Sequence, residues 1–152
     1  LTGSASRNQY MTLTNFDSNT FELRGQLAYA NDNLHLSASH GVLSDRAINQ
    51  RPGGNGHGSS THLLGRYAIS GSLSAELGYS YNTWKSSGMY APGLIDQVRN
   101  QSTRVTRATL SWPIRKNHTL QLEARIIRNR EEITIFAYNN RILQLSWLVY
   151  GL

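Results

Sequence analysis

The chain has 152 residues, of which 39% are hydrophobic and 16% charged, with no cysteine. This length suits one domain, and the missing cysteine excludes disulfides and thiolate chemistry. The net charge of +6 comes mostly from arginines that are dispersed along the chain, since Lys85 and Lys116 are the only lysines. We therefore expect no nucleic-acid partner, because such partners usually meet a gathered patch of mixed cations.

Apolar residues recur at every second position along six stretches, which is the period of a half-buried β-strand. In the stretch 21–29, for example, Leu27 and Tyr29 share one face while Glu22 and Arg24 share the other. The strands predicted in this way, after a weak first strand at 1–7, cover residues 21–29, 34–39, 62–69, 73–81, 107–114 and 120–126. The last strand, at about 138–152, is apolar at both parities, so its faces stay unassigned.

The connections between these strands alternate in length. Short turns rich in Asn, Asp, Gly and Ser lie at 30–33, 70–72 and 115–118, as tight hairpins require. Long polar connections lie at about 8–20, 41–60, 83–101 and 129–134. The sequence therefore predicts an all-β fold of about eight antiparallel up-and-down strands, with short turns on one rim and long loops on the other.

This layout matches the signature of a transmembrane β-barrel, whose strands of about 9–11 residues are apolar on one face only. Aromatic residues near both ends of the strands fit two membrane interfaces. The predicted interface aromatics are Tyr29, Tyr67 and Trp112 near the short turns, and Phe21, Tyr81 and Trp84 near the long loops. An alternative is a soluble β-barrel or sandwich whose apolar faces point inward around an apolar ligand.

The opposite face carries acidic and basic residues in near balance, which suits the lumen of a barrel. The predicted lumen-lining residues are Glu22, Arg24, Arg66, Glu76, Arg107, Glu123 and Arg125. These charges either form interlocked ion pairs that plug a narrow barrel or line a wider conduit.

We expect no catalytic site, metal site or cofactor. The pairs His35/His40 and His57/His62 are five residues apart, which places each pair on opposite faces of a strand. The His-, Ser- and Gly-rich segment between 40 and 62 offers no nucleophile in an activating context and reads as a solvated loop.

The stretch 128–141, RNREEITIFAYNNR, resembles the last loop and strand of a family of bacterial outer-membrane barrels. Their signature is roughly R-N-x-S-N-I-x-L-Y-x-Y-x-R, and Glu131-Glu132 replaces its Ser-Asn pair here. These barrels are attached to periplasmic tetratricopeptide-repeat domains. They include the surface lipoprotein assembly modifiers and, more loosely, the exopolysaccharide and cellulose export porins.

The resemblance implies a non-enzymatic export pore in the outer membrane of a Gram-negative bacterium, carrying a surface lipoprotein or a polysaccharide. The implied partners are outer-membrane lipid, the barrel-assembly machinery, a periplasmic repeat domain and the exported cargo. Residues 1–152 would form a single barrel domain or the C-terminal portion of a larger one. The weak strand at 1–7 favours the larger barrel, although eight strands suffice to close a small one. A second alternative is a small structural or adhesive outer-membrane barrel that functions through its extracellular loops.

Overall fold

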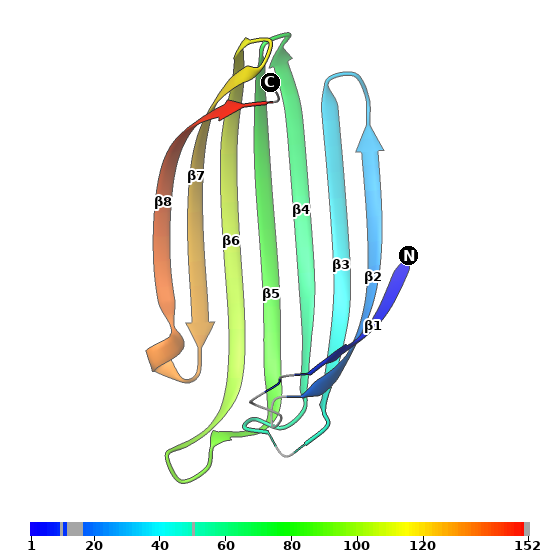
Figure 1. The fold of residues 1–152 in the computed structure, drawn as a ribbon, viewed down its shortest axis with the longest axis vertical. Helices are drawn as coiled ribbons and strands as arrows, with labels where there is room; N and C mark the ends of the chain where they lie inside the picture. The colour runs from blue at the N-terminus through cyan, green and yellow to red at the C-terminus, as the bar shows by residue number, and fades with distance from the viewer. Residues whose placement is uncertain (10, 12–16, 50, 151–152) are drawn as a thin grey trace.

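The computed structural model describes residues 1–9, 11, 17–49 and 51–150. The protein is all-β, with eight antiparallel up-and-down strands in one sheet and a 3-10 turn, η2, before the last strand. The elements are β1 (Thr2–Asn8), β2 (Ser18–Ala30), β3 (Leu34–Ala47), β4 (Gly56–Ser70), β5 (Leu73–Ala91), β6 (Ile95–Arg115), β7 (His118–Glu131), η2 (Thr134–Phe136) and β8 (Tyr138–Val149). Each strand pairs with the next one along the chain (Figure 1).

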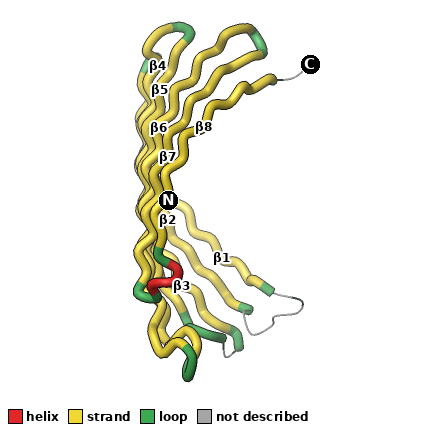
Figure 2. Tube along the Cα trace, turned by 90° about the vertical axis from the view of Figure 1, so that its left-hand side faces the viewer, coloured by secondary structure: helices red, strands yellow, loops and turns green. Residues whose placement is uncertain are grey.

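The sheet forms a single curved layer, as the view along its edge shows (Figure 2). Strands β1 and β8 are its two edges, and in the described part of the chain no pairing joins them. The sheet is therefore open in this structure. No helix among the described residues is long and apolar enough to cross a membrane.

The connections lie alternately at the two ends of the sheet, and three of the four opposite the short turns are longer than those turns, as predicted; the exception is 92–94. The short turns are residues 31–33, 71–72 and 116–117. In the first of them the Asn31 side-chain oxygen accepts hydrogen bonds from the backbone N–H groups of Asn33 and Leu34, at 3.1 and 2.8 Å. We call the opposite end, where residues 9–17, 48–55, 92–94 and 132–137 connect the strands, the long-loop end.

Two of the predicted long connections are mostly strand, which corrects the sequence-based boundaries. Strands β3 and β4 leave only 48–55 between them, and β5 and β6 leave only 92–94. The polar residues there lack alternation, yet they continue the backbone pairing of their hairpins. At the tip, Gly93 has φ +84° after Pro92 and Leu94 N–H donates to the Ala91 carbonyl, a pattern typical of a type II turn.

Strand parity gives the sheet one apolar face and one charged face. Along β7, Leu122 and Ile126 are exposed, whereas Glu123 and Arg125 on the other face are partly buried. Ile133, in the connection after β7, is the only buried hydrophobic residue in the described part of the chain. The apolar face is instead open, with Leu27 79% exposed and Leu143 76% exposed. A water-soluble domain covers such a face with a second layer.

The register also assigns the faces of the last strand, which the sequence pattern leaves open. Leu143 and Leu145 are the partners of Ala124 and Leu122, and paired residues share a face. Trp147 follows at the same parity opposite Leu120. The apolar face therefore continues to the β8 edge.

Candidate functional site

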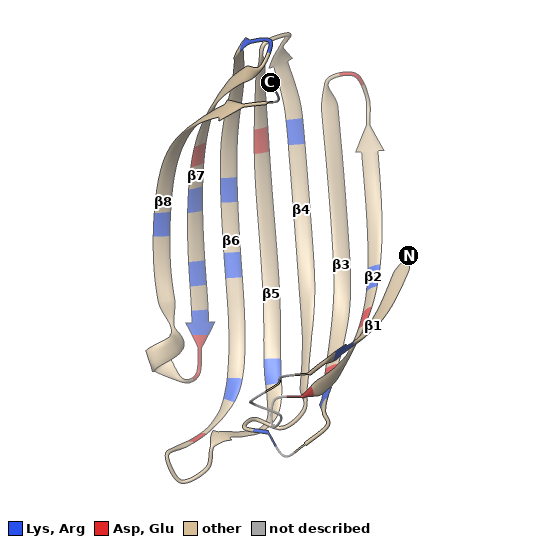
Figure 3. Ribbon diagram, viewed as in Figure 1, with Lys and Arg blue, Asp and Glu red and all other residues tan. Residues whose placement is uncertain are grey.

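The charged face gathers five of the seven predicted lumen-lining residues into one network across β4 to β7 (Figure 3). Arg66 is the register partner of Glu76, and Thr109 is the partner of both Glu76 and Glu123. One row further along, Arg107 is the partner of Arg125. These two rows of side chains come from four neighbouring strands. We call the group formed by Arg66, Glu76, Arg107, Glu123 and Arg125 the central charge network.

Ion pairs within the network offset its like charges. An Arg107 Nη2 atom lies 2.5 Å from Glu76 Oε1, and Arg125 forms an ion pair with Glu123 two residues earlier on its strand. Thr109 is only 6% exposed between the two glutamates. The arginine side chains remain 36–40% exposed, so these pairs are partly solvated and each contributes little to stability. Their guanidinium groups are accessible to ions or polar groups that approach this face.

Glu22 and Arg24 form a separate ion pair on β2, with 2.6 Å between Glu22 Oε1 and Arg24 Nη2. The pair lies over Gly41 of β3, where a Cβ atom would come within 3.2 Å of the same carboxylate oxygen. Arg24 and Gly41 are register partners, so the glycine leaves space for the pair. The charged face therefore carries two groups of charges, and only the central one joins several strands.

The predicted interface aromatics divide between the two faces. Five of them belong to the apolar face by parity and register, namely Phe21, Tyr29, Tyr67, Tyr81 and Trp112. Trp84 differs because its parity on β5 is that of Glu76. Its ring lies against Gly56 of the neighbouring strand, where a Cβ atom would come within 2.0 Å of Cζ2. Trp84 thus packs on the charged face, away from the Tyr81 side.

Two further ion pairs lie at the long-loop end and were not found from the sequence. Asp45 pairs with Arg51 and accepts a 3.0 Å hydrogen bond from the Thr20 hydroxyl. Arg99 Nε donates to Glu131 Oε1 at 2.7 Å, and the Glu131 side chain is fully buried. The partners are 6 and 32 residues apart in the sequence, so only the folded connections bring them together.

Asn129 fixes the connection between β7 and β8 next to the Arg99 pair. Its side-chain amide donates to the Phe136 carbonyl at 2.8 Å, and its side-chain oxygen accepts from Gln101 and Thr103 at 3.0 and 2.7 Å. Phe136 in turn lies beneath the Arg99 guanidinium, 5.5 Å from ring centroid to Cζ. These contacts hold η2 against β7, with the Arg99 side chain of β6 over Phe136.

As predicted, His35 and His40 lie on opposite faces of their strand, β3. His40 contacts the Thr61 hydroxyl at 2.9 Å, whereas His35 has the parity of the charged face opposite Arg66. The described residues contain no group of three or more His, Cys, Asp or Glu side chains placed to hold a metal ion.

Comparison of the chain with protein-family models, with curated proteins and with solved structures finds no match. Chemically, the central charge network presents paired acids and bases along one face of an open, curved sheet. Such a surface can contact water, ions or a polar molecule over several strands.

Proposed function

We propose that this sheet is part of the wall of a transmembrane β-barrel in a bacterial outer membrane, with its charged face lining the lumen. The observation that carries the proposal is the open apolar face, which continues across seven strands while the charged face is partly buried. Leu77, near the middle of this face, is 61% exposed. Burying such a face in lipid removes it from water at about 25 cal/mol per Å².

The two open edges support a barrel wider than the eight strands seen here. A strand in the hydrocarbon region must pair all of its backbone N–H and C=O groups, since no water is present to bond them. Strands β1 and β8 each pair on one side only. We infer that further strands join these edges and close the barrel, supplied by a longer chain or by other copies.

The charge network supports transport over a purely structural role. Ion-paired arginines that keep more than a third of their surface exposed can line a conduit and select what passes. The resemblance of residues 128–141 to the repeat-linked export barrels points to a surface lipoprotein or a polysaccharide as cargo. No catalytic step is part of this proposal.

The cysteine-free chain allows a direct test of which face meets lipid. Leu122 and Gln121 are neighbours on β7 but have opposite parity, so L122C and Q121C form a matched pair for spin labelling. In lipid vesicles we expect the label at 122 to collide with oxygen but not with a water-soluble nickel chelate. At 121 we expect collisions with the nickel chelate and fewer with oxygen than at 122, because that label faces the polar lumen.

The same experiment contains the result that would overturn the proposal. If the chain stays monodisperse in plain buffer and the label at 122 is shielded from both oxygen and nickel, the apolar face is covered by protein. The soluble barrel with an apolar ligand would then be the correct description.

A further inference from the structure

On β6, β7 and β8 the apolar face carries arginines on the long-loop side of Ala108, Ile126 and Leu143, with Arg104 near the middle of β6. Arg104 and Arg128 are register partners, Arg130 is two residues beyond Arg128, and Arg141 is the partner of Ile126. All four residues are exposed. We call Arg104, Arg128, Arg130 and Arg141 the arginine cluster.

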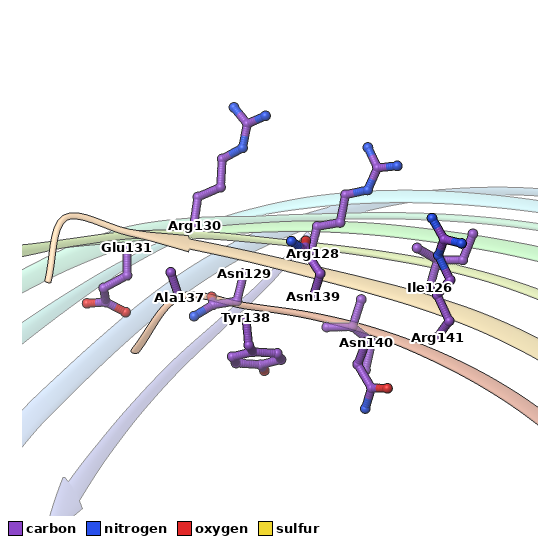
Figure 4. Close-up of a pocket in the computed structure, with 11 residues that line it drawn as sticks. Ile126, Arg128, Asn129, Arg130, Glu131, Ala137, Tyr138, Asn139, Asn140 and Arg141 are labelled. Carbon is purple, nitrogen blue, oxygen red and sulfur yellow. The ribbon is translucent and has the colours of Figure 1, made fainter. Parts of the chain in front are cut away.

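The cluster lies on the opposite side of the sheet from the charge network. Figure 4 shows Arg128 and Arg130 extending to one side of β7, while Glu131 and Tyr138 extend to the other. Neighbouring strands lie about 5 Å apart and alternate residues of a strand about 7 Å apart. Four guanidinium groups therefore share a small area of three strands.

The cluster differs from the charged face in how its charge is balanced. On the charged face, Arg24, Arg107 and Arg125 each have a glutamate partner. None of the ion pairs between described residues involves a member of the cluster. Of the two carboxylates that follow Arg130, Glu131 pairs with Arg99 and Glu132 accepts a 3.1 Å hydrogen bond from the Asn100 amide.

Like charges placed opposite each other on neighbouring strands destabilise a sheet. The direct pairing of Arg104 with Arg128 thus indicates an anion from outside the described chain. The Arg104 guanidinium lies over the Tyr81 ring, 5.2 Å from the centroid, which orients it without neutralising it. Arginine is suited to bind phosphate because its planar group donates two parallel hydrogen bonds.

The position of the cluster selects among phosphate-bearing partners. Toward the short-turn end, Ile126 follows Arg128 and Leu143 follows Arg141 on the same face of the sheet. The cations therefore lie directly beside apolar side chains. A lipid places a phosphorylated headgroup directly beside its acyl chains. A soluble polyphosphate or a nucleic acid would gain nothing from this apolar border.

We propose that the arginine cluster binds the phosphate groups of lipid headgroups in the membrane leaflet at the long-loop end. This inference rests on the proposed membrane function and adds a specific lipid partner to it. Two neighbouring phosphates on one lipid would fit the paired strands best, since Arg104 and Arg128 can contact one phosphate and Arg130 or Arg141 the other.

The test uses the full chain in neutral detergent micelles, titrated with a bis-phosphorylated glycolipid, lipid A, and with the same lipid after removal of both phosphates. We expect tight binding of the phosphorylated form only. The double variant R104Q/R128Q should weaken that binding at least about tenfold, because two charge-assisted contacts are lost. The control R115Q/K116Q removes the same charge at a short turn and should leave binding unchanged.

Three results would overturn the inference: equal binding of both lipids, unchanged binding by R104Q/R128Q, or an equal loss in the control. If R104Q/R128Q fails to fold, R130Q/R141Q supplies the same comparison from the other half of the cluster. The spin label at 122 separates the two proposals. A lipid-facing label without phosphate preference rejects the arginine cluster alone, whereas a label shielded from lipid rejects the membrane function itself.

Discussion

The fully buried carboxylate of Glu131 is held by Arg99, with 2.7 Å between Oε1 and Nε, across 32 residues of sequence. Removing the cation leaves a buried charge without its partner, which is costly. Because Arg99 is 35% exposed, we expect R99M to lower the free energy of unfolding by only about 2 kcal/mol. Urea unfolding in lipid vesicles would measure this loss.

A double variant and a matched control make that prediction specific. R99M/E131Q should recover part of the lost stability, because the buried group is then neutral. R46M removes an exposed arginine of β3 that takes part in none of the described ion pairs. An equal loss in R46M and R99M would contradict the role given to the Glu131 pair.

Gly56 fits beneath Trp84 because it has no side chain. A Cβ atom at this position would lie 2.0 Å from Cζ2 and 2.5 Å from Cη2 of the ring. We expect G56A to destabilise the protein by about 1–3 kcal/mol, the usual cost of overpacking. Thermal unfolding followed by circular dichroism would measure the effect.

The matched control for this position is Gly25, where a Cβ atom meets nothing within 4 Å. G25A should therefore leave stability nearly unchanged. In a W84L background the cost of G56A should fall, because the ring that it strikes is gone. A cost that persists in W84L would place its origin in the backbone instead.

Alternation along the chain was enough to predict the strand order, the two rims and the sides of most residues. It worked because Leu77, Tyr79 and Tyr81 can share a face only at a period of two. The predicted strands were too short at the long-loop end of β3, β4, β5 and β6, where polar and apolar residues no longer alternate. Gly56 and Gly58 read as loop, yet they pair with Ser86 and Trp84 of β5. Neither position has space for a side chain, because a Cβ atom would meet the Trp84 ring at Gly56 and the Thr83 carbonyl oxygen at Gly58.

The face of the sheet on which the charged residues lie was easier to predict than their ion-pair partners. Arg66 is directly opposite Glu76, but the ion pair of Glu76 is with Arg107 on the other neighbouring strand. Choosing between such partners depends on register and rotamer, which period alone does not supply. The arginine cluster had a simpler signal, since Arg128 and Arg130 continue the parity of Ile126 along β7.

A charge placed on the apolar face should be costly in a membrane and tolerated in water. Leu77 is the register partner of Gly65 and Ala108, near the middle of this face. We expect L77R to lose about 2–4 kcal/mol in vesicles, the range for a cation at the bilayer midplane. S80R, on the charged face of the same strand, should lose much less. Equal stability of L77R and the parent protein would favour a face exposed to water.

Arg107 should influence ion flow if the charge network lines a conduit. R107A removes one positive charge and releases Glu76, whose carboxylate lies 2.5 Å from it. We expect a changed single-channel conductance in planar bilayers, with selectivity shifted toward cations because the acidic group is left uncompensated. R115A, at the last residue of β6, removes the same charge outside the network and should conduct like the parent. Unchanged conductance of R107A together with a lower thermal stability would instead show that the ion pairs close the lumen, because then only packing depends on them.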